Sequence, residues 1–202
     1  MRKFTDDTLL VATHNAGKLD EIRALLAPYG VTVLGAGEKG LAVPDETETT
    51  FVGNARIKAH AGAVATGLPA LSDDSGIVID ALDGAPGVHT ADWAETGQGR
   101  DFVMAMTRAH DALVARKAPQ PWTGRFCCTL VLAWPDGHDE VFEGTVDGWI
   151  VWPMRGASGH GYDPVFEPLG YDLTFGEMDP KQKNRISHRA DAFRKLVERC
   201  FG

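Results

Sequence analysis

Short apolar runs alternate along this chain with segments whose apolar residues recur at helical spacing. Residues 8–12 form the first apolar run, and Leu19, Ile22 and Leu26 then repeat at the spacing of one helix face until Pro28. Strands that alternate with helices are typical of an α/β fold, in which helices cover the faces of a sheet. The order of these first elements therefore favours a layered α/β fold.

Two later strands break the strict alternation. Residues 126–134 and 141–146 have the composition of strands, and Pro135, Asp136 and Gly137 join them with a signal typical of a hairpin. A hairpin makes its two strands antiparallel, whereas a strand–helix–strand unit makes them parallel. The sequence therefore predicts a mixed sheet rather than a doubly wound parallel one.

Three further helices are predicted by the apolar spacing and by the breakers that follow it. One covers residues 50–66, one begins at Phe102 and ends before Pro119, and one begins near Ser187. No repeat, low-complexity tract or linker interrupts the sequence. We therefore expect residues 1–202 to form a single domain.

The composition argues against two classes of partner. The chain has 20 Lys+Arg against 28 Asp+Glu, and its formal net charge of -8 is a poor match for a nucleic-acid polymer. The longest uncharged apolar stretch, residues 126–134, is too short to span a bilayer, and residues 9–12 are too short for a signal peptide. Three cysteines, two of them adjacent, do not form a disulfide framework. We expect a cytoplasmic protein with neither a nucleic-acid polymer nor a membrane as partner.

The loop after the first strand is a candidate anion site. Free N–H groups and the helix dipole favour negative charge at the start of a helix. Lys18 lies in the first turn, where the dipole disfavours a cation unless an anion compensates, and Thr13 and Asn15 could donate to that anion. The spacing is not that of a Walker A loop. The alternative is a capped surface helix with a solvated lysine.

Two acidic clusters are candidates for a metal. Asp45, Glu46 and Glu48 precede the helix at residues 50–66, where acids usually complement the dipole, and the spacing does not say which of them would bind an ion. Asp73 and Asp74 follow an apolar run, and we expect them at a strand end. Mg²⁺ binds carboxylate oxygens and keeps waters that can act as nucleophiles, while the alternative is a turn capped by its own side chains.

Two late segments could contact a polar ligand. Residues 156–163 are rich in glycine, which lets a ligand approach the backbone closely, and they contain His160, Tyr162 and Asp163. Residues 183–189 hold four basic or potentially basic groups just before the last predicted helix, where cations oppose the helix dipole. A bound anion or polar ligand would explain that concentration of positive charge, and a solvated helix start is the alternative.

Six short motifs follow one another along nearly the whole chain. They are Thr13-x-Asn15-x-x-Lys18, Thr50-Phe51-x-x-Asn54-Ala55-x-x-Lys58-Ala59, Ser72-Asp73-Asp74-Ser75-Gly76, Gly84-Ala85-Pro86-Gly87-Val88, Gly159-x-Gly161-Tyr162-Asp163-Pro164-x-Phe166 and Lys183-x-x-Ile186-Ser187-His188-Arg189. Each is weak alone. In this order they resemble the non-standard purine NTP pyrophosphatase family, the inosine/xanthosine triphosphate pyrophosphatases.

The resemblance implies a fold and an activity. The fold is an elongated mixed β-sheet with flanking helices, in two lobes around a central nucleotide-binding cleft. The activity is the Mg²⁺-dependent hydrolysis of ITP, dITP or XTP to the monophosphate and pyrophosphate, which cleanses the nucleotide pool. It also implies a homodimer.

The resemblance also assigns roles to residues. By this resemblance the phosphates are bound by the loop after the first strand and by one further lysine, Lys58. The loop residues are Thr13, His14, Asn15, Ala16, Gly17 and Lys18. By the same resemblance the metal is bound by Glu46, Asp73 and Asp74. The catalytic residues are Asp74, as the proton acceptor, and Lys18. Substrate and base contacts fall to Ser75, His160, Gly161, Tyr162, Asp163, Lys183, His188 and Arg189.

The chemistry of the last two residues agrees with their assignment. His188 and Arg189 are donors, which suit the 6-oxo group of hypoxanthine or xanthine, whereas adenine would place its amino group against them. The chain departs from the family pattern at three positions: His160 replaces a common phenylalanine, Asp92 an arginine, and Ala190 a glycine. Only the His160 departure bears on base preference and on the pH profile.

Two other functions remain open at this point. One is a related nucleotide pyrophosphatase that acts on pyrimidine or modified nucleotides, against which the Ser187-His188-Arg189 segment argues. The other is a nucleotide-binding module without catalysis, which would be expected to lack an acid pair such as Asp73 and Asp74.

Overall fold

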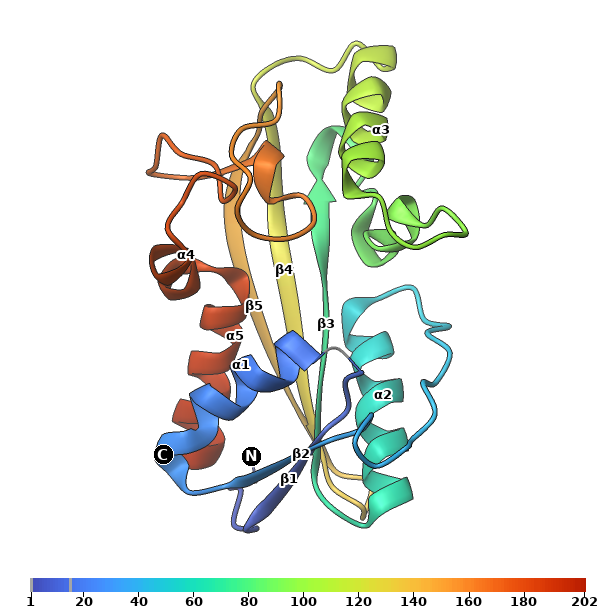
Figure 1. Ribbon diagram of the computed structural model, residues 1–202, viewed down its shortest axis with the longest axis vertical. Helices are drawn as coiled ribbons and strands as arrows, with labels where there is room; N and C mark the ends of the chain where they lie inside the picture. The colour runs from blue at the N-terminus through green and yellow to red at the C-terminus, as the bar shows by residue number, and fades with distance from the viewer. Residues whose placement is uncertain (1, 15) are drawn as a thin grey trace. The chain divides into compact units, whose positions relative to one another are not determined.

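A six-stranded mixed sheet organises the computed structural model, which describes residues 2–14 and 16–202. The sheet order is β2-β1-β3-β4-β5-β6, and β1 is parallel to β2 and β3 while β5 is antiparallel to β6 (Figure 1). The strands are β1 Thr8–Val11, β2 Thr32–Gly35, β3 Ala70–Ile79, β4 Trp122–Ala133, β5 Asp139–Ile150 and β6 Phe166–Pro168. The predicted α/β class with a mixed sheet is confirmed.

The helices agree with the apolar spacing, with one addition. They are α1 Ala16–Leu26, α2 Phe51–Thr66, α3 Phe102–Ala115, α4 Pro180–Ile186 and α5 His188–Leu196, the last followed by a π-helical turn at Val197–Phe201. The short elements α4, β2 and β6 were not predicted. None of the helices in the described part of the chain is long and apolar enough to cross a membrane.

The chain divides into two compact units. The first comprises Met1–Asp74, Thr129–Glu143 and Ala192–Gly202, and the second comprises Ser75–Cys128 and Gly144–Asp191. Strands β3, β4 and β5 each contribute residues to both units. That the whole chain acts as one two-lobed domain stays a prediction.

In the first unit, α1 and α2 pack on opposite faces of the sheet (Figure 1). A Cβ added at Gly62 of α2 would lie 2.8 Å from Leu10 Cδ2, and one added at Gly35 would lie 2.5 Å from Leu19 Cδ2 of α1. Paired residues of neighbouring strands point to the same face of a sheet, and successive residues point to opposite faces. Leu10 pairs with Leu34, the neighbour of Gly35, so the contacts at Leu10 and at Gly35 lie on opposite faces. Small residues on both faces therefore let the helices approach the strands closely.

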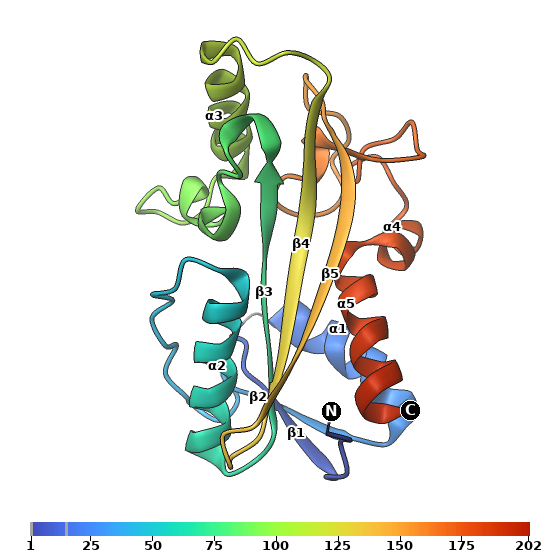
Figure 2. The same cartoon turned by 180° about the vertical axis from the view of Figure 1, so that it is seen from behind.

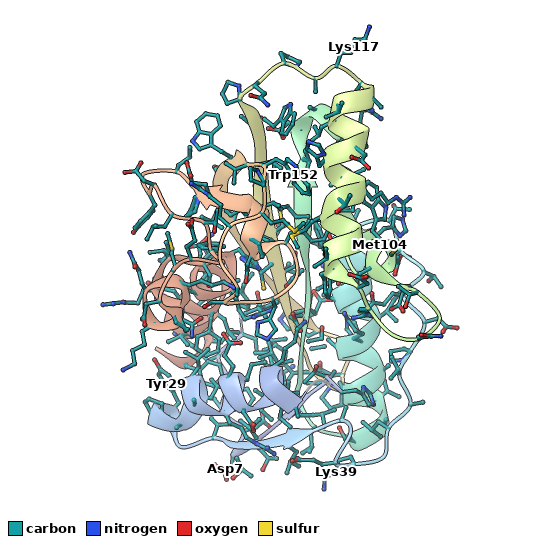
Figure 3. All side chains as sticks on the ribbon, turned by 45° about the horizontal axis from the view of Figure 1, so that its top comes forward. Asp7, Tyr29, Lys39, Met104, Lys117 and Trp152 are labelled. Atoms are coloured by element: carbon teal, nitrogen blue, oxygen red, sulfur yellow. The ribbon has the colours of Figure 1, made fainter. Side chains whose placement is uncertain are left out.

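In the second unit, α3 lies beside the end of β3 and covers a core of aromatic and aliphatic side chains (Figure 2). Met106, Ala109 and Leu113 are buried in that core, as the helical spacing predicts. The opposite side of the helix leaves Met104 exposed (Figure 3). The helix is therefore amphipathic, with one face in the core.

Candidate active site

The two adjacent aspartates lie inside a strand, not at its end. Residues 72–76 belong to the continuous strand β3, so the expectation of a strand end or a turn is wrong. Successive side chains of a strand point to opposite faces. Asp73 therefore faces the α1 side of the sheet and Asp74 faces the α2 side, where Ser72 Oγ also donates to Ala55 O at 2.5 Å.

Asp73 pairs with Lys18 on the α1 side. Lys18 Nζ lies 2.6 Å from Asp73 Oδ2, and the carboxylate is only 7% exposed. Lys18 stands in the first turn of α1, where the dipole disfavours a cation, and the carboxylate offsets that effect. The compensating anion inferred from the sequence is thus supplied, in this structure, by the protein itself.

The loop before α1 holds the remaining residues of the first motif. Thr13 donates its N–H to Val11 O at 2.8 Å, and a ring nitrogen of His14 lies 2.8 Å from Leu41 O. Ala16 and Gly17 open α1. Asn15 lies outside the described residues.

Lys58 of α2 lies between two acids on the other side of the sheet. Its Nζ is 2.6 Å from Glu46 Oε1 and 3.6 Å from Asp74 Oδ1. Burial alone would lower the pKa of Lys58, but the nearby carboxylates of Asp74, Glu46 and Asp73 outweigh burial and raise that pKa above its usual value. Lys58 is therefore firmly protonated.

Asp74 is the perturbed acid of the site. It is 8% exposed, and burial, with the charges of Glu46 and Asp73, raises its pKa to about 6 although Lys58 opposes the shift. Among the described residues, no donor lies within hydrogen-bonding distance of its buried Oδ2. A carboxyl group with this pKa and one unused oxygen is suited to exchange a proton near neutral pH.

Asn54 is part of the site that the sequence reasoning did not assign. It is buried one helical turn before Lys58, its Oδ1 accepts the Glu48 N–H at 2.9 Å, and its hydrogen bond to Asp74 lowers the pKa of that acid. The sequence carried a signal for Asn54, because it lies four residues before Lys58 and residues four apart share one face of a helix. Thr50 Oγ1 caps the same helix by accepting the Gly53 N–H at 3.0 Å, which fixes where α2 begins.

The acids fit a hard cation only in part. No group of three His, Cys, Asp or Glu side chains within residues 2–14 and 16–202 is gathered closely enough to hold a metal ion. Glu46 and Asp74 lie at Lys58, and Asp73 lies at Lys18. The donor type nevertheless suits a divalent cation, since all three are carboxylates and Asp74 has an unused buried oxygen.

In the second unit, Asp163 holds the glycine-rich loop and α4 together. Its carboxylate is 2% exposed, accepts the His160 N–H at 2.6 Å and forms an ion pair with Lys183 Nζ. A Cβ added at Gly159, whose φ is +83°, would lie 2.0 Å from Asp163 Oδ2. Only glycine therefore leaves room for this carboxylate.

The other residues assigned to the base differ in exposure. Tyr162 is buried with its ring at 74° to that of Phe102, and burial raises the pKa of its phenol. His188 is buried and stacks on Phe126 at 4.9 Å between ring centres. Half-buried or exposed positions are those of Ser75, His160, Gly161 and Arg189.

The basic segment before the last helix is arranged differently from the prediction. Lys183 and Arg185 lie in the last turn of α4, where cations favour the dipole, so the expected conflict is wrong for them. Only His188 and Arg189 open α5. The positive charge of Lys183 and Arg185 thus has a structural reason, its interaction with the dipole of α4.

Comparison with known proteins places these residues in a family. The model of the Ham1 family matches residues 9–199. A dITP/XTP pyrophosphatase of Ruegeria pomeroyi is 71% identical, covering 100% of this chain and 98% of the relative, and one of Agrobacterium fabrum is 56% identical over 100% and 99%. A solved HAM1 protein from Coxiella burnetii superposes with a TM-score of 0.89 at 34% identity, covering 95% of this chain and 96% of that one.

Proposed function

The chain belongs to the Ham1 family, and on that premise we propose that it hydrolyses non-standard purine nucleoside triphosphates, namely ITP, dITP and XTP. The products are the nucleoside monophosphate and pyrophosphate. One observation carries the proposal: the buried Asp74 carboxyl, with a pKa raised to about 6 and an unused oxygen, lies beside Lys58 in the first unit. Relatives named dITP/XTP pyrophosphatases support the substrate class.

The proposed reaction is the attack of water on the α-phosphorus. Asp74 accepts the water proton at its unused Oδ2, an oxygen from water bonds to phosphorus, and the bond to the bridging oxygen breaks so that pyrophosphate leaves. Because a triphosphate carries about four negative charges near neutral pH, convergent cations must offset them. Lys18 and Lys58 supply two.

Mg²⁺ is the metal we propose for this site. Asp74, Glu46 and Asp73 would hold it. When bound, such a cation lowers the pKa of a water and neutralises phosphate charge.

Recognition of the base is proposed to rest on residues of the second unit. His188 is fixed by its stacking on Phe126, and Lys183 by its ion pair with Asp163. With Arg189 they offer donors, which suit a 6-oxo group and oppose the amino group of adenine. His160 keeps an exposed imidazole that could stack on a base.

We also propose an oligomeric state and a location. The homodimer rests on the resemblance of the six motifs. A cytoplasmic location is supported by the substrate, since nucleoside triphosphate pools are used there, and by the three cysteines, Cys127, Cys128 and Cys200, none of which is in a disulfide.

Product analysis tests the reaction. ITP is incubated with the protein in Mg²⁺ and, separately, in excess chelator, and pyrophosphate and orthophosphate are scored apart. We expect metal-dependent release of pyrophosphate and monophosphate in equal amounts. Release of orthophosphate, or equal rates after chelation, would overturn the proposal.

The role of Asp74 has its own test. Asp74→Asn keeps the shape of the side chain and removes the proton acceptor, so kcat should fall by about 10³-fold or more while nucleotide binding stays measurable. Asp20→Asn, which removes an equal charge from an exposed position of α1, is the matched control and should keep the wild-type rate. Equal rates for Asp74→Asn and the control would rule out Asp74 as the acceptor.

A further inference from the structure

Each acid of the β3 pair holds a lysine that the proposed function assigns to the phosphates. Lys18 comes from α1 and lies 2.6 Å from Asp73, while Lys58 comes from α2 and lies 2.6 Å from Glu46 and 3.6 Å from Asp74. The alternation of β3 produces this arrangement, because it sends Asp73 and Asp74 to the two helix-covered faces. The cations needed for phosphate are therefore already neutralised by the carboxylates suited to a metal.

This arrangement disfavours an anion that arrives without a cation. Within the ion pairs that the described residues form here, three carboxylates face two lysines, so these five groups carry one excess negative charge when all are ionised. A polyphosphate would also have to displace Asp73 from Lys18. The hydrogen bond between these two residues is strong, because it is short, joins two charged groups and ends at a carboxylate that is only 7% exposed. A divalent cation that binds the carboxylates removes both obstacles.

We propose that Asp73 is a positioning residue that neutralises Lys18 until a divalent cation takes its carboxylate, so that metal and phosphate bind with positive coupling. The proposal rests on the proposed function for the identity of the ligand as a polyphosphate. Coupling is reciprocal, so phosphate also tightens the binding of the metal. The direct ion pair of Asp73 is with Lys18, whereas Lys58 pairs with Glu46 and Asp74 and is affected by Asp73 only through its charge.

The experiment measures binding rather than turnover. Inorganic pyrophosphate is the probe, because it has no base and is a product, not a substrate, of the proposed reaction. Calorimetric titration gives its Kd in excess chelator and in saturating Mg²⁺. For the wild type we expect Mg²⁺ to tighten binding by about tenfold or more, which is the typical size of such a coupling.

Asp73→Asn is the central variant. It should tighten metal-free pyrophosphate binding by about tenfold and shrink the gain from Mg²⁺, because Asp73 no longer neutralises Lys18. Asp20→Asn removes an equal charge from an exposed position of α1 that lies 3.7 Å from Arg23, and should leave both Kd values within about twofold. A metal-free Kd for Asp73→Asn within about twofold of wild type, or an equal gain in Asp20→Asn, would overturn the proposal.

Lys18→Gln removes the other partner of the Lys18–Asp73 pair and tests the proposal even if Asp73→Asn does not fold. Lys18 is already neutralised without metal, so this variant should leave metal-free binding within about twofold and weaken Mg²⁺-dependent binding by about tenfold. Equal weakening in both conditions would contradict the proposal. Coupled pyrophosphate binding in a protein that does not turn over ITP would refute the proposed function and leave this inference standing.

Discussion

At the scale of single residues, the alternation of β3 decides the chemistry of the first unit. Asp73 and Asp74 are adjacent in the chain, yet one pairs with Lys18 of α1 and the other lies near Lys58 of α2. Burial raises the pKa of Asp74 and leaves its Oδ2 without a donor among the described residues. Two identical side chains in consecutive positions are thereby suited to different tasks.

The raised pKa of Asp74 has a consequence for stability. A carboxyl whose pKa rises from 3.8 to about 6 on folding stabilises the protein fully below its unfolded pKa and loses that contribution as pH rises through about 6. In chelator, Asp74→Asn should therefore gain stability relative to wild type between about pH 4 and pH 7, by up to about 3 kcal/mol. Urea unfolding of both proteins at about pH 4 and at about pH 7 measures the difference in their free energies of unfolding. A difference that is the same at both pH values would contradict this prediction.

His160 allows a test of the role of the glycine-rich loop. Its imidazole is exposed, while its backbone N–H donates to the Asp163 carboxylate and its backbone C=O accepts the Asp163 N–H. If the ring only stacks on the base, His160→Phe should keep or raise kcat/KM for ITP at both pH 6 and pH 8, because a phenyl ring also stacks on a purine. A loss of about tenfold or more at both pH values would show instead that the imidazole hydrogen-bonds the base.

At the scale of elements, long periodic segments were predictable and short ones were not. The helices α2 and α3 lie where apolar spacing and breakers placed them, with Thr50 as the cap of α2. The strand β2 and the helix α4 carry too few residues for a period to show. Residues 72–76 were misplaced at a strand end, because polar residues and glycine resemble a turn unless the partners that bury them are known.

A close approach of two loops gives a stability prediction at this scale. A Cβ added at Gly156 would lie 2.1 Å from the Gly176 backbone, whereas one added at Gly170 meets nothing within 4 Å, and both glycines have a φ above +80°. Gly170→Ala should therefore cost only the backbone strain, about 1–2 kcal/mol, and Gly156→Ala a further 1–3 kcal/mol. Thermal and urea unfolding compare the two, and equal losses would exclude a steric role for the contact.

At the scale of the whole molecule, the family and the α/β fold could be predicted from the sequence, while the ion pairs within the site could not. The order of six motifs from Thr13 to Arg189 gave the family, which the match over residues 9–199 confirms. The ion pair of Lys18 with Asp73 depends on which face of β3 that acid occupies, and the ion pair of Lys58 with Glu46 depends on where the loop before α2 lies. They follow only from the fold, as does the buried Asn54 beside Asp74.

We propose that this chain selects 6-oxo purine triphosphates and cleaves them between the α- and β-phosphates. Internal competition tests it most directly: ITP and ATP at equal concentration share one reaction with Mg²⁺, and the loss of each and the two monophosphates are followed together. We expect ITP to be converted to IMP and pyrophosphate with a kcat/KM about 10³-fold above that for ATP. Consumption of both nucleotides at similar rates, or appearance of the diphosphates, would contradict it.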